Sequence, residues 1–251
     1  LFQKDILFNN LGLIIIDEQH KFGVSQRIEL SKKGGKNCDI LLMSATPIPR
    51  TLHLAFYGDM DISKITEKPV DRKEIITLSK PEEKISEVID FAKIQIEKGM
   101  QVFWICPLIE ESKLLDYSAA VAKYSLLKKK FHDKVGLIHG SLSSEEKEFV
   151  LKKFLNRELS ILVTTTVIEV GIDFPNASVI VVENSNKFGL SQLHQLRGRV
   201  GRGTAQGTCL LLFKKNLSEN AKKRIKILKS TNDGFKIAEE DLKIRGFGDV
   251  L

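Results

Sequence analysis

Two adjacent carboxylates, Asp17 and Glu18, follow an apolar run at residues 11–16 that is typical of a buried parallel strand. Open α/β sheets bind their ligands at the carboxyl ends of such strands. One carboxylate there can help to hold Mg²⁺ while the next orients or deprotonates an attacking water, as nucleoside triphosphate hydrolysis requires. An ordinary acidic turn would share this pair, but the strand before it and Gln19 and His20 after it favour the catalytic interpretation.

Small hydroxyl residues follow the next apolar run. Ser44 and Thr46 come after a strand expected at 40–43, and two prolines then begin a helix expected at 49–57. Such hydroxyls can relay hydrogen bonds from the acidic loop toward a neighbouring groove. By itself, this segment indicates only the start of a helix. Together with the acids upstream, it becomes a specific sign of the same candidate site.

A threonine run at 164–166 ends another expected strand, at 160–164. The hydroxyls of Thr164 and Thr165, together with a free helix N-terminus, suit contacts to phosphate. Gly171 permits a close backbone approach, and Asp173 can accept from a ribose or position an arginine. A threonine-rich strand exit with no ligand is the alternative.

Arginines and glycines alternate after Gln195, in the sequence QLRGRVGRG. Glycine disfavours a helix and charge disfavours a core, so we expect these arginines to face solvent or a ligand. The spacing of Arg199 and Arg202 predicts two guanidinium groups near one point, where they can bind phosphate oxygens bidentately.

Short β-branched runs alternate with helical periodicity, which predicts an α/β fold with parallel sheets. The expected strands are 11–16, 40–43, 102–106, 135–139, 160–164, 179–183 and 209–213. The expected helices are 49–57, 82–97, 112–131, 145–155 and 191–197, with a linker at 66–74. A lysine-rich amphipathic helix after residue 214 and a second helix at 235–244 form a predicted hairpin, followed by a basic loop from Arg245.

The composition fits an ordinary globular protein: 251 residues, 42% hydrophobic and 28% charged. The apolar runs are far shorter than the roughly 20 residues of a membrane span. Three scattered cysteines without Cys-x-x-Cys spacing indicate neither zinc nor a disulfide framework, so we expect a cytoplasmic protein. The net charge of +7 suits a polyanionic partner but is weak support by itself.

Four motifs in this order resemble those of superfamily-two helicases: DEQH, SATPIPRT, TTTVIEVGIDFPNA and QLRGRVGRG. More narrowly, DEQHKFGV, SATPIPRTL, ENSNKFGLSQLHQLRGRVGRG, TNDGF and DLKIRGFGD resemble the RecG family of bacterial, ATP-dependent, branch-migrating DNA helicases. The resemblance runs along the whole chain. It implies two RecA-like lobes with ATP and Mg²⁺ in the cleft between them, and branched or duplex DNA as the partner.

The resemblance also implies roles for individual residues. Asp17 matches the Mg²⁺-coordinating acid, Glu18 the catalytic base and His20 the fourth residue of the same motif. Arg199 and Arg202 match the arginine fingers, and Gln195 the glutamine that leads their motif. The resemblance further implies that Gly171 and Asp173 contact the nucleotide. It also implies that Ser44, Thr46 and Arg245 take part in coupling between the sites. The implied DNA contacts are Arg50, His139, Gly140, Thr164, Thr165 and Arg245.

One departure from the family is large. The phosphate-binding loop, G-x-x-x-x-G-K-[ST], does not occur in this sequence, and neither do the adenine-reading segment and the N-terminal wedge domain of RecG proteins. With a first residue of Leu, the chain is expected to be a piece of a longer protein. We expect residues 1–68 to be part of the first lobe, 69–213 the complete second lobe and 214–251 the helical hairpin and loop that couple them to DNA.

Three functions remain open at this stage. The first is the motor of a RecG-like helicase that remodels stalled forks and Holliday junctions, with a single-stranded DNA-binding protein as a further partner. The second is the translocase of a transcription-repair coupling factor, which shares several motifs. The third is a non-catalytic nucleic-acid-binding module, because half of the expected ATP site is missing from the chain.

Overall fold

The computed structural model describes residues 6–18, 24–34, 38–44, 61–65, 67, 73–107, 113–165 and 174–245. The chain forms two compact units, Leu1–Ile48 and Pro49–Leu251, and each is described by itself. Within the described residues, no helix combines the length and the apolar character needed to cross a membrane.

The first unit is a parallel β-α-β arrangement. Strands β1 (Leu13–Ile16) and β2 (Asp39–Leu42) pair in parallel, with Ile16 opposite Leu42, and helix α1 (Val24–Gly34) connects them. Ile14 and Ile16 are buried together with Leu30 of α1, so one face of the two strands forms a small core. The sequence did not predict α1, because its apolar residues are few and lysines crowd its end; parallel pairing of β1 and β2 requires a crossover connection of this kind.

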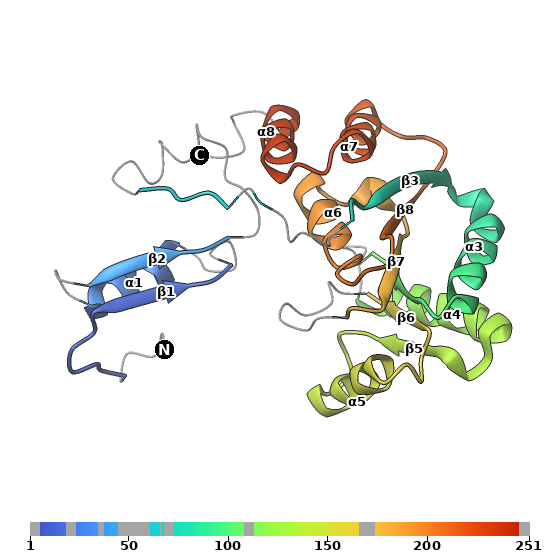
Figure 1. The fold of residues 1–251 in the computed structure, drawn as a ribbon, viewed down its shortest axis with the longest axis horizontal. Helices are drawn as coiled ribbons and strands as arrows, with labels where there is room; N and C mark the ends of the chain where they lie inside the picture. Colours follow the sequence, from blue (N-terminus) through green and yellow to red (C-terminus); the bar gives the residue numbers. More distant parts are fainter. Residues whose placement is uncertain are drawn as a thin grey trace. The chain divides into compact units, whose positions relative to one another are not determined.

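The second unit is a six-stranded parallel sheet covered by helices (Figure 1). Its strands are β3 (Ile76–Pro81), β4 (Gln101–Ile105), β5 (Val135–Ile138), β6 (Ile161–Thr164), β7 (Ala177–Val182) and β8 (Thr208–Phe213). Their order in the sheet is β3-β8-β7-β4-β6-β5. Its helices are α3 (Ile85–Glu97), α4 (Lys113–Phe131), α5 (Ser144–Leu155), α6 (Leu190–Arg197), α7 (Glu219–Ser230) and α8 (Gly234–Arg245). Short 3₁₀ turns, η2 (Glu82–Lys84), η3 (His132–Lys134) and η4 (Ser185–Lys187), join some of these elements.

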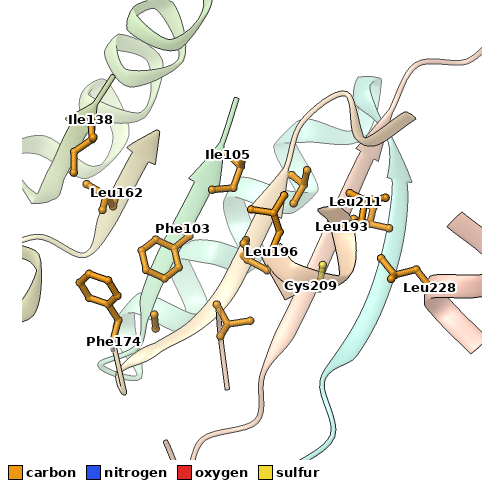
Figure 2. Packing of buried hydrophobic residues seen from close by; sticks show 14 of the residues in the cluster. Phe103, Ile105, Ile138, Leu162, Phe174, Leu193, Leu196, Cys209, Leu211 and Leu228 are labelled. Atoms are coloured by element: carbon orange, nitrogen blue, oxygen red, sulfur yellow. The ribbon is translucent and has the colours of Figure 1, made fainter. Parts of the chain in front are cut away.

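Alternation along the central strands builds two cores, one on each face of this sheet. Phe103 and Ile105 of β4 pack with residues of α5, α6 and α7, whereas Val102 and Trp104 pack with α3 and α4. Figure 2 shows the first core, where Phe103 lies beside Phe174 with ring centroids 5.4 Å apart. Because β4 is buried on both faces, its sequence is apolar from Val102 to Ile105, as is typical of a central parallel strand.

The fold predicted from the sequence is confirmed as α/β with parallel sheets, but β3 was not predicted. Its sequence, ITLSKP, lacks a continuous apolar run and ends in Lys80 and Pro81, which suit an edge strand. Backbone pairing with β8 stabilises this strand, although its own sequence carries no strand pattern. The helix expected at 49–57 lies outside the described residues.

The helical hairpin of α7 and α8 follows the predicted periodicity. Ala221, Ile225 and Leu228 are buried on one face of α7, whose first turn is capped by Ser218. The Asp233 carboxylate accepts from the backbone N–H of Phe235 at 2.8 Å and so begins α8. One correction is needed: Arg245 is the last residue of α8 and does not open a loop, since the helix continues one residue further than predicted.

Candidate nucleotide and DNA site

The acidic pair lies at the carboxyl end of β1, as predicted. The backbone N–H of Glu18 donates to Asp17 Oδ1 at 2.8 Å, and Glu18 has a φ of 49°, a left-handed conformation that is uncommon for a residue other than glycine. Asp17 is exposed and Glu18 is half-buried. The Met43 N–H donates to the Ile16 carbonyl at 2.8 Å, so the register of the two strands brings Ser44 to the same edge as the acids.

Four predicted contact residues lie at the carboxyl ends of β5 and β6, which are paired neighbours. His139 and Gly140 follow β5, while Thr164 ends β6 and Thr165 follows it. The Thr165 N–H donates to the Ile138 carbonyl at 3.3 Å, so the two strand ends lie side by side. Both threonines are buried, and the Thr165 Oγ1 atom has no hydrogen-bond partner among the residues that the structure describes.

His139 begins a tight connection to α5. The Leu142 N–H donates to the His139 carbonyl, and Ser143 then caps α5 in a capping box with Glu146. Partial burial lowers the pKa of the His139 imidazole; the nearby charge of Glu146 opposes this effect and that of Lys147 adds to it. Above its ordinary pKa of 6.5 the ring is neutral, so it can only offer a hydrogen bond to a phosphate.

The arginines lie on α6 and the loop that follows it. Gln195 and Arg199 are half-buried, and Arg202 is exposed with its Nε donating to the Gly198 carbonyl at 3.2 Å. Two positions of this loop favour glycine for different reasons. Gly201 has a left-handed φ of +67°, and a Cβ on Gly203 would lie 2.5 Å from the Pro175 carbonyl oxygen. The loop is therefore tightly held against its neighbours while Arg202 remains accessible.

Arg197 contradicts the expectation that every arginine of this motif faces solvent or a ligand. It belongs to α6 and is only 2% exposed. Its guanidinium donates to the carbonyls of Leu228 and Thr231 at 2.7 and 2.9 Å, and to His194 Nδ1 at 2.9 Å. Burial lowers the pKa of this group. A buried arginine is satisfied here because the last carbonyls of α7 lack partners within their own helix, a fact that no local pattern in the sequence reveals.

A second contact joins α6 to the hairpin. Ser191 Oγ donates to Asp241 Oδ2 at 2.7 Å, and Asp241 is buried. Helix α6 is therefore connected to α8 near its start and to α7 at its end. The segment that carries the predicted arginine fingers and the hairpin thus form one packed body.

Several predicted site residues lie outside the described residues: His20, Thr46, Arg50, Gly171 and Asp173. The side chain of Arg245 is likewise not described. In the part of the chain that the structure describes, no three His, Cys, Asp or Glu side chains gather as a metal site. The acids belong to the first unit, and the threonines, histidine and arginines to the second.

Parallel sheets with polar residues at their carboxyl edges, and an arginine-glycine motif after α6, are features of the RecA-like helicase lobes. Residues 83–204 match the helicase conserved C-terminal domain. The fold, the site and this match thus define the class: the chain has the architecture of RecA-like helicase lobes.

Within that class the chain is similar over its whole length to the RecG helicases. It is 51% identical over its whole length to the ATP-dependent DNA helicase RecG of Thermotoga maritima and 48% identical to that of Escherichia coli K12. A solved structure of RecG bound to a three-way DNA junction covers the whole chain with a TM-score of 0.78 at 47% identity. The chain spans 32% and 37% of the lengths of those two relatives, about a third of each.

Proposed function

We propose that the protein to which this chain contributes is an ATP-dependent DNA helicase that translocates on duplex DNA and remodels branched DNA, such as stalled forks and Holliday junctions, in recombination and repair. The observation that supports this proposal is the similarity of the whole chain to RecG, including a RecG structure solved in complex with a three-way DNA junction. Bacterial DNA as the partner would place the protein in the cytoplasm, at the nucleoid.

We also propose how the chain is organised within that motor. Residues 1–68 contribute to the first lobe, 69–213 form the second lobe, and 214–251 form the hairpin and loop that couple the motor to DNA. The contacts of α6 with both hairpin helices support this division of labour, because they join the arginine-bearing segment to the coupling element.

The residues present fit ATP with Mg²⁺ as the cofactor. Mg²⁺ takes oxygen ligands and keeps several waters, so one exposed carboxylate at a strand end, Asp17, is a suitable protein ligand. The unpartnered buried Thr165 hydroxyl and the accessible Arg202 are groups of the kind that bind phosphates. When bound, ATP supplies the free energy of phosphoanhydride hydrolysis.

In this proposal each side chain has one task. Glu18 orients the attacking water and holds its proton, and Arg199 and Arg202 stabilise negative charge on the phosphates, with Gln195 and His20 positioned beside them. Gly171 and Asp173 contact the nucleotide. Ser44 and Thr46 relay the state of the acidic loop, and Arg245 couples the hairpin to DNA. The DNA contacts come from Arg50, His139, Gly140, Thr164 and Thr165.

Unwinding of branched DNA tests the proposed function. The intact protein is mixed with a fluorescently labelled synthetic fork, a three-way junction or a linear duplex of the same length, and strand release is followed with and without ATP. We expect release from the fork and the junction that requires both ATP and Mg²⁺ and greatly exceeds release from the linear duplex. ATP hydrolysis without strand release from any branched substrate would contradict the assignment.

A further inference from the structure

An open groove of about 410 Å³ lies between strands β3 and β8 and α7, the first helix of the proposed coupling hairpin; none of its lining residues is among the individual site residues assigned above. Figure 1 shows α7 beside these two strands at the edge of the large sheet. Phe213, Leu217 and Ile225 form its apolar floor. Three lysines of α7 line it at intervals of four and three residues, on one side of the helix: Lys222, Lys226 and Lys229.

The charge along this groove is largely uncompensated. Among the described residues, no carboxylate lines it. Lys222 is paired with Glu219 at 2.7 Å, but neither Lys226 nor Lys229 has a carboxylate within 4.0 Å among the described residues. By contrast, Lys215, which lies just before α7 and does not line the groove, is paired with Glu83 at 3.3 Å. An apolar floor with a cationic rim is therefore complementary to a ligand that is both acidic and apolar.

We propose that this groove is a docking site for an acidic, amphipathic peptide segment of a partner protein. A large apolar side chain of the peptide would fill the space above Leu217 and Ile225, while its carboxylates would meet the ammonium groups of Lys226 and Lys229. This mode uses the two kinds of complementarity seen in peptide grooves, an apolar anchor and a charged rim.

Nucleic acid fits the groove less well. A phosphate backbone would satisfy the lysines but leave the apolar floor unused. A base would need an exposed aromatic face for stacking, whereas Phe213, the aromatic residue of the floor, is half-buried and packed against the core cluster. A peptide uses both the floor and the rim, so it is the favoured occupant.

Fluorescence anisotropy with the 251-residue chain tests the proposal. The probe is a labelled 12-residue peptide that alternates glutamate with leucine and phenylalanine; a second peptide replaces its apolar residues with serine. We expect the first peptide to bind with a Kd on the order of 10⁻⁵ M, typical of a small interface, and the serine peptide to bind at least tenfold more weakly. Equal binding of the two peptides would overturn the proposal.

A charge-matched pair of variants locates the site. Lys226→Glu removes a lysine that lines the groove, and Lys223→Glu makes the same charge change on the same helix at a residue that does not line it. We expect peptide binding to fall at least tenfold in the first variant and less than about threefold in the second, since general electrostatics affects both alike. Equal losses in the two variants would show that the lysines act only through net charge.

A variant in the apolar floor of the groove distinguishes peptide binding from DNA binding. Leu217→Ser should weaken peptide binding at least fivefold while leaving the binding of a duplex oligonucleotide within twofold, and an unchanged thermal midpoint verifies that the chain is folded. If Leu217→Ser leaves peptide binding intact, or if Lys226→Glu weakens only oligonucleotide binding, the groove is not a peptide site.

Discussion

At the scale of single residues, the most distinctive feature of the first unit is the conformation of the acidic pair after β1. Glu18 holds a left-handed φ of 49° directly after Asp17, whose carboxylate accepts from the Glu18 N–H. Such a backbone conformation costs energy in a residue with a side chain and tends to occur at functional sites. The hydrogen bond and the left-handed backbone fix the two acids at adjacent positions directly after β1, which suits one for a metal and the other for water in the proposed site.

Glu18→Gln in the intact protein should leave ATP binding near normal while turnover falls by a factor of about 10² or more. The amide keeps the shape of the side chain but removes the group that orients water and takes its proton. Nucleotide affinity by calorimetry and steady-state phosphate release check this prediction. Parallel losses of affinity and turnover would assign Glu18 to binding instead.

His139 gives a pH-dependent prediction. Its pKa is lowered in the folded chain, first by partial burial, so the unfolded chain binds more protons in the interval below the ordinary value of 6.5. The contribution of this residue to stability is therefore complete above pH 6.5 and is lost as the pH falls through the pKa of the folded state. NMR titration of the ring should give a pKa below 6.5, and Lys147→Gln should raise it because Lys147 is one of the groups that lower it.

At the scale of elements, Arg197 shows how α6 is attached to the hairpin. Arg197→Ala removes the donors for the last carbonyls of α7 and leaves a cavity in a buried region. We expect a loss of about 3 kcal/mol in the free energy of unfolding, because buried carbonyl acceptors lose their donor and a cavity remains. Chemical denaturation of the 251-residue chain measures it.

Arg202→Ala is the matched control for that experiment. Because Arg202 is exposed, its removal should change the free energy of unfolding by no more than about 0.5 kcal/mol. In the intact protein, however, we expect it to lower DNA-stimulated ATP turnover by on the order of 10³ or more, as the loss of an arginine finger does. Similar stability losses in the two variants would remove the distinction between the buried and the accessible arginine.

At the scale of the whole molecule, the sequence motifs divide between two compact units. The acids belong to one and the arginines to the other, so hydrolysis in the proposed motor depends on both. The phosphate-binding loop of the family does not occur in these 251 residues.

The 251-residue chain should therefore not hydrolyse ATP appreciably, with or without DNA. The loop that normally cradles the β- and γ-phosphates contributes much of the binding and catalysis in such enzymes. A coupled phosphate-release assay, with the intact protein measured in parallel, checks this. DNA-stimulated turnover by the pure chain, at a rate comparable to that of the intact protein, would contradict it.

The sequence by itself determined the α/β class, most strands and helices and the apolar face of α7, because these depend on local periodicity. It also identified the acids and Arg202 as candidates, since their residue types and spacing suit phosphate chemistry. Strand β3 and helix α1 had no local signal, because their stability comes from pairing with β8 and from a crossover between parallel strands.

Only the tertiary structure decided which arginine serves which purpose. Arg197, Arg199 and Arg202 stand in one motif with equal formal charge, yet Arg197 is buried against α7 while Arg202 is exposed. The difference arises because the unpaired carbonyls of a helix 31 residues further along the chain reach Arg197. The lysine-rimmed groove was likewise decided only by the tertiary structure, because its apolar floor is formed by residues of both β8 and α7. Contacts between residues distant in sequence create both features, and no local pattern contains them.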